Sequence, residues 1–321
     1  MDKRLEELIR FMTERGITDL HLEKDNLMKI EGRNGRLWSR VPVQEGDEQL
    51  FSYLKYLSDM DLSDGSRPQS GSFEYRMAGK TYSFRFAYLS ARGQRSAVLR
   101  IMNCRDAVPL ERMFMKGEQR SMIRSWCQRE NGLIVLSGPT GAGKTTAAYS
   151  LLASMKDKKI YSLEDPVEVY QKGIVQIQVN AAAGLDYAAG IRQLLRHDPD
   201  VVMIGEIRDE DTARMTLRCA LTGHLVITTL HASSCRASLL RMMELGLSAM
   251  DLEDVLAGIT NQRLVDLDHP GARGCIFEMA DPAMIRKMLH QEHTEGGLYK
   301  EMEYAVRKKW ITAEEARKYG G

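Results

Sequence analysis

The stretch GPTGAGKTT at residues 138–146 constrains this chain more than any other, because it matches the phosphate-binding pattern G-x-x-x-x-G-K-[ST] in full. The apolar run LIVL precedes it and the helical stretch TTAAYSLLASM follows it, as the pattern requires. In such a loop, glycines let backbone amide groups turn toward phosphate oxygens, and the positive end of the next helix attracts the same anion. The alternative, a glycine-rich turn that binds nothing, does not explain this context.

Two side chains of the loop have specific expected roles. Lys144 is expected to reach the β and γ phosphates of ATP, and the hydroxyl of Thr145 to ligate Mg²⁺. The motif predicts nucleotide binding, but it does not say what happens to the nucleotide. The residues expected to bind the nucleotide are Gly138, Pro139, Thr140, Gly141, Ala142, Gly143, Lys144, Thr145 and Thr146.

Short apolar runs alternate with helical patterns after about residue 108. The expected strands are GLIVLSG, KIYSLED, DVVMIGE and HLVITTLH. Strands that alternate with helices predict an α/β fold with parallel pairing and right-handed crossovers.

The first hundred residues show a different pattern of apolar and polar residues. Apolar residues at helical spacing predict an amphipathic helix that ends at Gly16, and residues 26–105 read as an antiparallel sheet. The stretch KTYSFRFAYLSA alternates aromatic and polar residues, as in a half-buried strand. We therefore expect a sheet domain at 1–107 and a nucleotide-binding domain at 108–321.

Carboxylates end two of the expected parallel strands. Glu164 and Asp165 end one of them, and Glu206 follows another after Gly205. Ligands of open α/β sheets bind at the carboxyl edge, so both glutamates are candidates for catalysis. Glu206 reaches one methylene further than an aspartate, so it could contact the shell of Mg²⁺ while Gly205 lets the backbone pass close.

Two histidines flank the strand LVITTL. His224 precedes it, and a structural role is the plainer interpretation for such a residue. His231 ends the strand at the carboxyl edge, where a sensor of the γ phosphate would sit. A structural role and a sensing role both stay open for His231.

Composition argues against several classes of protein. The 45 Lys and Arg residues balance 44 Asp and Glu residues, so no strong field draws the chain to nucleic acid, and no direct nucleic-acid partner is expected. Five scattered cysteines without a CxxC pair argue against disulfide and zinc frameworks and for a reduced, cytoplasmic location. The charged N-terminus is unlike a signal peptide, and no apolar run could span a bilayer, so any membrane contact would be peripheral.

Four motifs in one order resemble the signatures of the secretion-type ATPases that power type II secretion systems and type IV pili. They are GPTGAGKTT, SLEDPVE, LLRHDPDVVMIGEIRDEDTA and TGHLVITTLHA, which look like the family's Walker A, acidic box, atypical Walker B and histidine box. TDLHLE looks like the family's opening signature, and NQRLVDL like the segment that closes its ATPase core. The resemblance implies a RecA-like P-loop core with a smaller, PAS-like N-terminal domain.

The resemblance also implies roles for individual residues. Glu164 would activate the attacking water, Glu206 would coordinate or orient Mg²⁺ and water, and His224 and His231 would sense nucleotide. Arginines from the N-terminal domain would complete the active site of a homohexamer. Arg85 and Arg100 match best, whereas Arg92 and Arg95 match less well, and a solvated charge is the alternative for each.

The chain departs from several members of the family. It has no paired-cysteine zinc module after the core, only Cys275, and its last residues do not look like the helix motif of retraction members. It therefore looks most like the ATPase that assembles the competence pilus for DNA uptake in Gram-positive bacteria. The implied partner is a membrane-embedded platform protein, reached at the cytoplasmic face of the membrane.

Of four other functions, two stay open. A retraction ATPase or a DNA-translocating ATPase of type IV secretion belongs to the same superfamily, and stimulation by duplex DNA would identify the second. A P-loop kinase would need an acceptor pocket and an arginine-rich lid, which the sequence does not indicate. A scaffold that only binds nucleotide would not need both glutamates.

Overall fold

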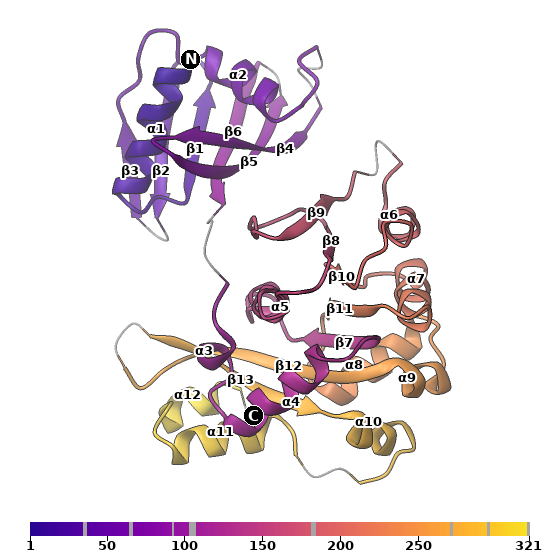
Figure 1. Cartoon of the computed structure of the whole chain (residues 1–321). Helices are drawn as coiled ribbons and strands as arrows, with labels where there is room; N and C mark the ends of the chain where they lie inside the picture. Colours follow the sequence, from indigo (N-terminus) through magenta and orange to yellow (C-terminus); the bar gives the residue numbers. More distant parts are fainter. Residues whose placement is uncertain are drawn as a thin grey trace. The chain divides into compact units, whose positions relative to one another are not determined.

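The computed structural model describes residues 1–321 except for 35–36, 64–66, 92, 103–106, 181–183, 270–271, 294–295 and 320–321. Two compact units make up the chain (Figure 1). The first is Met1–Arg105 with Glu168–Tyr170, and the second is Asp106–Val167 with Gln171–Gly321. The boundary expected between residues 107 and 108 lies close to this division.

The first unit is a six-stranded antiparallel sheet in the order β3-β2-β1-β6-β5-β4, with two helices packed on it (Figure 1). Its apolar core joins helix residues such as Leu8 and Phe51 to strand residues such as Phe84 and Phe86. The alternation seen in the sequence therefore separates a buried face from an open one. The elements are α1 (Asp2–Glu14), β1 (Asp19–Lys24), β2 (Met28–Asn34), β3 (Leu37–Val41), α2 (Gln49–Leu57), β4 (Gln69–Met77), β5 (Lys80–Ala91) and β6 (Gln94–Met102).

The sheet begins at Asp19, before the expected start at residue 26, and this expectation was wrong. The segment of β1 mixes charged residues with apolar ones, so its strand character is weak in the sequence. Pairing on both sides, with β2 and with β6, places it inside the sheet. Leu20 and Leu22 then point into the core and are completely buried.

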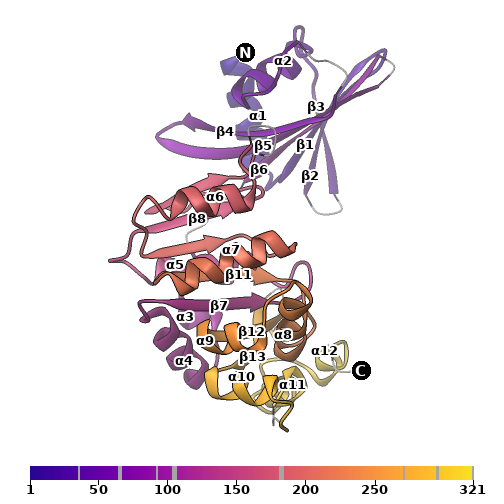
Figure 2. The same ribbon diagram turned by 90° about the vertical axis from the view of Figure 1, so that its right-hand side faces the viewer.

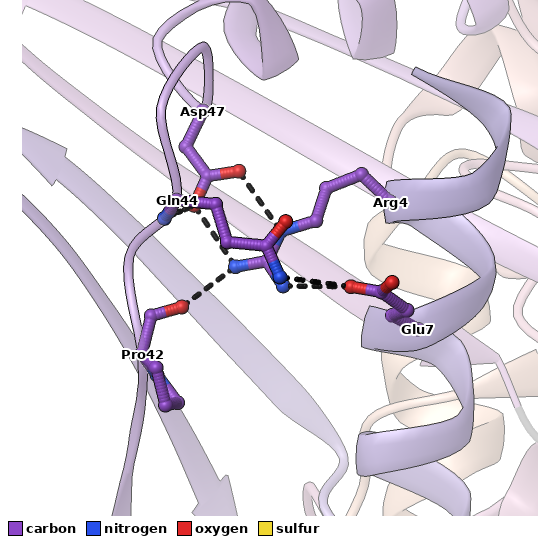
Figure 3. Close-up of polar contacts among 5 residues, drawn as sticks. All are labelled: Arg4, Glu7, Pro42, Gln44 and Asp47. Atoms are coloured by element: carbon purple, nitrogen blue, oxygen red, sulfur yellow. Dashed lines mark hydrogen bonds and ion pairs between the residues drawn. The ribbon is translucent and has the colours of Figure 1, made fainter.

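An arginine clip joins the first helix to the loop that follows β3 (Figure 3). Arg4 donates to both carboxylate oxygens of Asp47 at 2.9 Å and to the carbonyl oxygen of Pro42 at 2.7 Å. The backbone N–H of Gln44 also donates to Asp47, at 2.8 Å. Because Asp47 is 2% exposed, this ion pair is a buried part of the unit.

The second unit is built on a seven-stranded sheet in the order β13-β12-β7-β11-β10-β8-β9. Its neighbouring strands pair in parallel, except for the antiparallel pair of β12 and β13. Every residue of β7, β8, β10 and β11 is buried, as expected for parallel strands with both faces covered. The strands are β7 (Gly132–Ser137), β8 (Ile160–Glu164), β9 (Ile174–Gln178), β10 (Val201–Ile204), β11 (Leu225–Leu230), β12 (Leu256–Asp266) and β13 (Arg273–Ala280).

Helices cover the second sheet on both faces. Helices α6 to α10 share one apolar core with it, and Figure 2 looks onto this face. Helix α5 lies on the opposite face, next to β7 and β11 (Figure 1). The helices are α3 (Leu110–Met113), α4 (Gly117–Cys127), α5 (Lys144–Ala153), α6 (Tyr187–Leu194), α7 (Glu210–Leu221), α8 (Cys235–Glu244), α9 (Ala249–Val255), α10 (Pro282–Leu289), α11 (Leu298–Arg307) and α12 (Ala313–Arg317).

The four parallel strands expected from the sequence are β7, β8, β10 and β11. Strands β9, β12 and β13 were not predicted from the sequence, because polar residues interrupt their apolar pattern. Within the described ranges, no helix is long and apolar enough to cross a membrane.

Candidate functional site

The phosphate-binding loop connects β7 to α5, as its motif predicts. Gly138 has φ 151° and Gly143 has φ 85°, conformations that L side chains rarely adopt. A Cβ at Gly138 would also lie 2.7 Å from the carbonyl oxygen of Gln262, so the loop needs glycine there for space as well. The loop then leads directly into the amino end of α5, where backbone N–H groups attract an anion.

Lys144 folds back over the same loop. Its ammonium donates to the carbonyl oxygens of Gly138 at 2.9 Å and Pro139 at 3.0 Å. Burial lowers the pKa of Lys144, the carboxylate of Glu206 opposes this shift, and the charge of Arg263 adds to it. Lys144 is thus a largely buried cation with acidic and basic neighbours, as a phosphate-binding lysine requires.

Glu206 follows β10 at the same edge of the sheet. Arg208 donates to one of its carboxylate oxygens, and also to Asp165 at 3.2 Å. The other oxygen lies 3.8 Å from Nε2 of His231. The hydrogen bond to Glu206 is the main reason why the pKa of Arg208 is raised. The structure therefore brings Lys144, Glu206 and His231 into one electrostatic cluster at the carboxyl edge.

Gly205 has a clear steric reason to precede Glu206. A Cβ at this position would lie 2.9 Å from the hydroxyl of Tyr187 and 3.3 Å from the carbonyl oxygen of Leu163. Gly205 also donates its N–H to Leu163 at 2.8 Å and accepts the hydroxyl of Thr229 at 2.7 Å. The glycine thus lets β8 and β11 hold the end of β10 closely on both sides.

Glu164 ends β8 next to this cluster, but its side chain is 3% exposed. One carboxylate oxygen accepts the hydroxyl of Tyr149. The other accepts the hydroxyl of Ser162 at 2.5 Å and the amide of Gln176 at 3.1 Å. Both oxygens are therefore engaged by protein donors, and a water molecule could reach Glu164 only if one of these bonds opened.

The two histidines lie at opposite ends of strand β11. His231 follows the last residue of β11, and burial together with the charge of Lys144 lowers its pKa, so it favours the neutral form. His224 precedes the same strand, and its Nδ1 lies 3.2 Å from both the Thr222 hydroxyl and the Cys219 carbonyl oxygen. A six-residue strand is roughly 20 Å long, so within this unit His224 does not join the phosphate-binding loop.

The arginines expected from the first unit lie on neighbouring strands. Arg85 and Arg100 are directly opposite each other on β5 and β6. The side chain of Arg100 is 56% exposed and donates to Asp19 at 2.5 Å. Arg95 lies 5.9 Å from the ring centre of Phe51, whereas Arg92 falls outside the described residues. Arg85 and Arg100 are therefore two neighbouring cations on the open face of their sheet.

Several residues that hold the site together were not predicted from the sequence. Tyr149 and Gln176 hold Glu164, and Arg208 holds Glu206. Arg208 lies two residues after Glu206, so its proximity was readable from the sequence. The contacts of Tyr149 and Gln176 were not, because α5 and β9 approach β8 only in the folded sheet.

Known proteins resemble this chain in sequence and in structure. Residues 2–305 match the family described as "Type II/IV secretion system protein". The chain is 34% identical over 259 residues to "Competence protein ComGA" of Bacillus subtilis, a match that covers 79% of this chain and 73% of that protein. It is 32% identical over 328 residues to the protein of the same name from Halalkalibacterium halodurans, and that match covers 94% of each.

A solved structure shows the same fold. The structure entitled "Crystal Structure of the Pilus Retraction Motor PilT and Bound ADP" superposes with a TM-score of 0.76, over 98% of this chain and 96% of that one, at 23% identity. This likeness confirms the α/β fold with a RecA-like core that the sequence indicated.

Proposed function

This chain belongs to the type II/IV secretion system protein family and is an ATPase, and from that premise we propose that it is the motor that assembles a competence pilus for DNA uptake. The match to a competence protein over 94% of both chains favours this role over the other members of the family. We place the motor in the cytoplasm as a homohexamer that acts on a membrane-embedded platform protein. Retraction of a pilus and translocation of DNA are the alternatives.

One observation carries the enzymatic part of the proposal. Lys144 of the phosphate-binding loop, Glu206 after β10 and His231 after β11 lie at one edge of one sheet and influence one another electrostatically. A triphosphate in the loop would place its terminal phosphate beside a carboxylate and a neutral imidazole. This is the arrangement that hydrolysis of ATP by positioning and charge neutralisation needs.

The oxygen donors at this edge fit Mg²⁺. The hydroxyl of Thr145, in the first turn of α5, and the carboxylate of Glu206 are the hard ligands that this ion prefers. Mg²⁺ usually takes one or two protein ligands, and substrate phosphates and water complete its shell. Mg²⁺ would neutralise charge on the phosphates, while Lys144 and the amides of the loop hold them.

We propose Glu164 as the general base. It ends the strand beside β10, and its carboxylate becomes available when the Tyr149 or Gln176 hydrogen bond exchanges for water. Hydrogen bonds of this kind often rearrange when substrate binds. Arg85 and Arg100 of the first unit are the proposed source of additional positive charge, as in other enzymes that transfer phosphoryl groups.

Phosphate release from protein fractionated by size tests the proposal directly. We expect hydrolysis in the hexamer fraction and little in the monomer fraction, because the site needs arginines that a ring neighbour supplies. Full turnover by an isolated monomer would contradict the ring mechanism. Lys144→Ala should abolish binding of a labelled ATP analogue, and stimulation of hydrolysis by duplex DNA would favour the DNA-translocating alternative.

A further inference from the structure

The middle of β12 lies between the two loops of the proposed active site. Asn261 of β12 is paired with Ser137, the last residue of β7. At that point β7 ends and the phosphate-binding loop begins, whereas β12 continues to Asp266. The next residues of β12, Gln262 and Arg263, therefore run past the phosphate-binding loop.

Asn261 and Gln262 contact the end of β7 and the phosphate-binding loop that follows it. The side-chain amide of Asn261 donates to the hydroxyl of Ser137 at 2.8 Å. Gln262 donates to the carbonyl oxygen of Ala142 at 2.7 Å, and its own carbonyl oxygen is the atom that leaves no room for a side chain at Gly138. Arg263 donates to this same carbonyl oxygen at 2.9 Å.

The same residues also contact the loop that follows β11 and carries His231. Asn261 donates to the carbonyl oxygen of Ala232 at 3.0 Å. Arg263 donates to the carbonyl oxygen of Ser233 at 3.1 Å and to the side-chain oxygen of Asn261 at 2.8 Å. Its guanidinium thus holds the loop after β11 directly, at Ser233, and is linked to the phosphate-binding loop only through Asn261 and Gln262 of its own strand.

The positive charge of Arg263 also acts on the phosphate-binding loop. It is among the groups that lower the pKa of Lys144, so its field reaches the ammonium that would bind phosphate. Burial lowers the pKa of Arg263 itself, and the carboxylate of Glu278 opposes this shift. The described hydrogen bonds of its guanidinium are to neutral oxygens of Asn261, Gln262 and Ser233.

We propose that Arg263 is a positioning residue of the ATPase site, which fixes the loop of His231 to the part of β12 that packs on the phosphate-binding loop, so that His231 moves with the bound phosphates. This inference rests on the proposed function. A planar guanidinium with several fixed donors suits such a bridge, because it can hold two carbonyl groups and an amide at once. Lysine has a single nitrogen and cannot reproduce this geometry.

Arg263→Gln tests the bridge, because it removes the charge and most donors while keeping a polar side chain. We expect turnover to fall about 10- to 100-fold, in line with typical coupling between sites, with the dissociation constant of a labelled ATP analogue within about threefold. Arg263→Lys should recover a small part of the loss. Arg241→Gln, on the exposed side of α8, is the matched control and should leave turnover unchanged.

Hydrogen–deuterium exchange gives a readout that does not depend on hydrolysis. In the unaltered protein, a nonhydrolysable ATP analogue should slow exchange in the phosphate-binding loop and also in residues 231–234. In Arg263→Gln, protection should remain in the phosphate-binding loop and disappear from residues 231–234.

The outcomes separate this inference from the proposed function. Absence of protection at residues 231–234 in the unaltered protein would overturn the bridge, as would unchanged turnover in Arg263→Gln. A parallel loss of ATP binding and thermal stability in that variant would show an ordinary structural role and would also overturn it. Failure of the unaltered hexamer to release phosphate would refute the motor, whatever the exchange experiment shows.

Discussion

Replacing Glu164 by glutamine separates the structural role of this carboxylate from its proposed role as base. Three protein donors bind it, from Tyr149, Ser162 and Gln176. A hydrogen bond to a charged acceptor contributes about 1 kcal/mol more than one to a neutral acceptor, so three bonds lose about 3 kcal/mol. Burying an amide costs less than burying a carboxylate, which offsets part of this loss.

We therefore expect a net loss of about 1–3 kcal/mol in the free energy of unfolding for Glu164→Gln. For a unit of this size, each kcal/mol lowers Tm by about 2–4 °C. Turnover should fall by about 10² to 10⁴-fold, the usual contribution of a general base. Binding of ATP should persist, because Lys144 and the loop amides do not contact Glu164.

The assay measures phosphate release by the hexamer fraction well below the Tm of each variant, with titration of a labelled ATP analogue alongside. Tyr149→Phe is the control, because it removes one of the three hydrogen bonds and keeps the carboxylate. It should lower Tm but change turnover by less than about tenfold. The difference in turnover between the two variants separates the loss of the catalytic base from the loss of stability.

Two results would refute this reasoning. If Glu164→Gln kept its turnover, the base would be Glu206, and Glu206→Gln should then show the larger loss. If Tyr149→Phe lost as much turnover as Glu164→Gln, Glu164 would act as a structural anchor of β8.

Three further predictions concern stability. Asp47→Asn should lower the free energy of unfolding by about 2 kcal/mol in urea titration, because it leaves the Arg4 guanidinium without its buried partner, and an unchanged midpoint would contradict this. Burial raises the pKa of Glu278 above its usual 4.5, so folding holds its proton more tightly, and stability should fall as the pH rises through the interval above 4.5. Glu278→Gln should remove this fall, so a wild-type-like pH profile would argue against it. Gly205→Ala should lower the free energy of unfolding by about 1–3 kcal/mol, because its methyl group would clash with the Tyr187 hydroxyl. Adding Tyr187→Phe to the same chain should recover part of this loss. Additive losses from the two substitutions would rule out the clash.

The fold was predictable where local pattern and burial agree. The fully buried strands β7, β8, β10 and β11 read clearly, because each is a short apolar run bounded by turn residues or followed by a motif. Strand β1 was not predictable, because its charged residues interrupt the apolar pattern. Its position is set by pairing with strands on both sides. Strand β12 carries buried Asn261 and Gln262, which look like surface residues in the sequence.

Local features of the chain establish which residues can bind phosphate and where the carboxylates lie, because a loop motif and the ends of parallel strands are recognisable in short segments. What surrounds them comes from long-range packing: Glu164 is held by Tyr149 from α5, and Arg263 of β12 holds the carbonyl oxygen of Ser233, 30 residues earlier in the chain. Contacts of this kind depend on which strands become neighbours. That order is set by how all the strands and helices pack together, and no single segment encodes it.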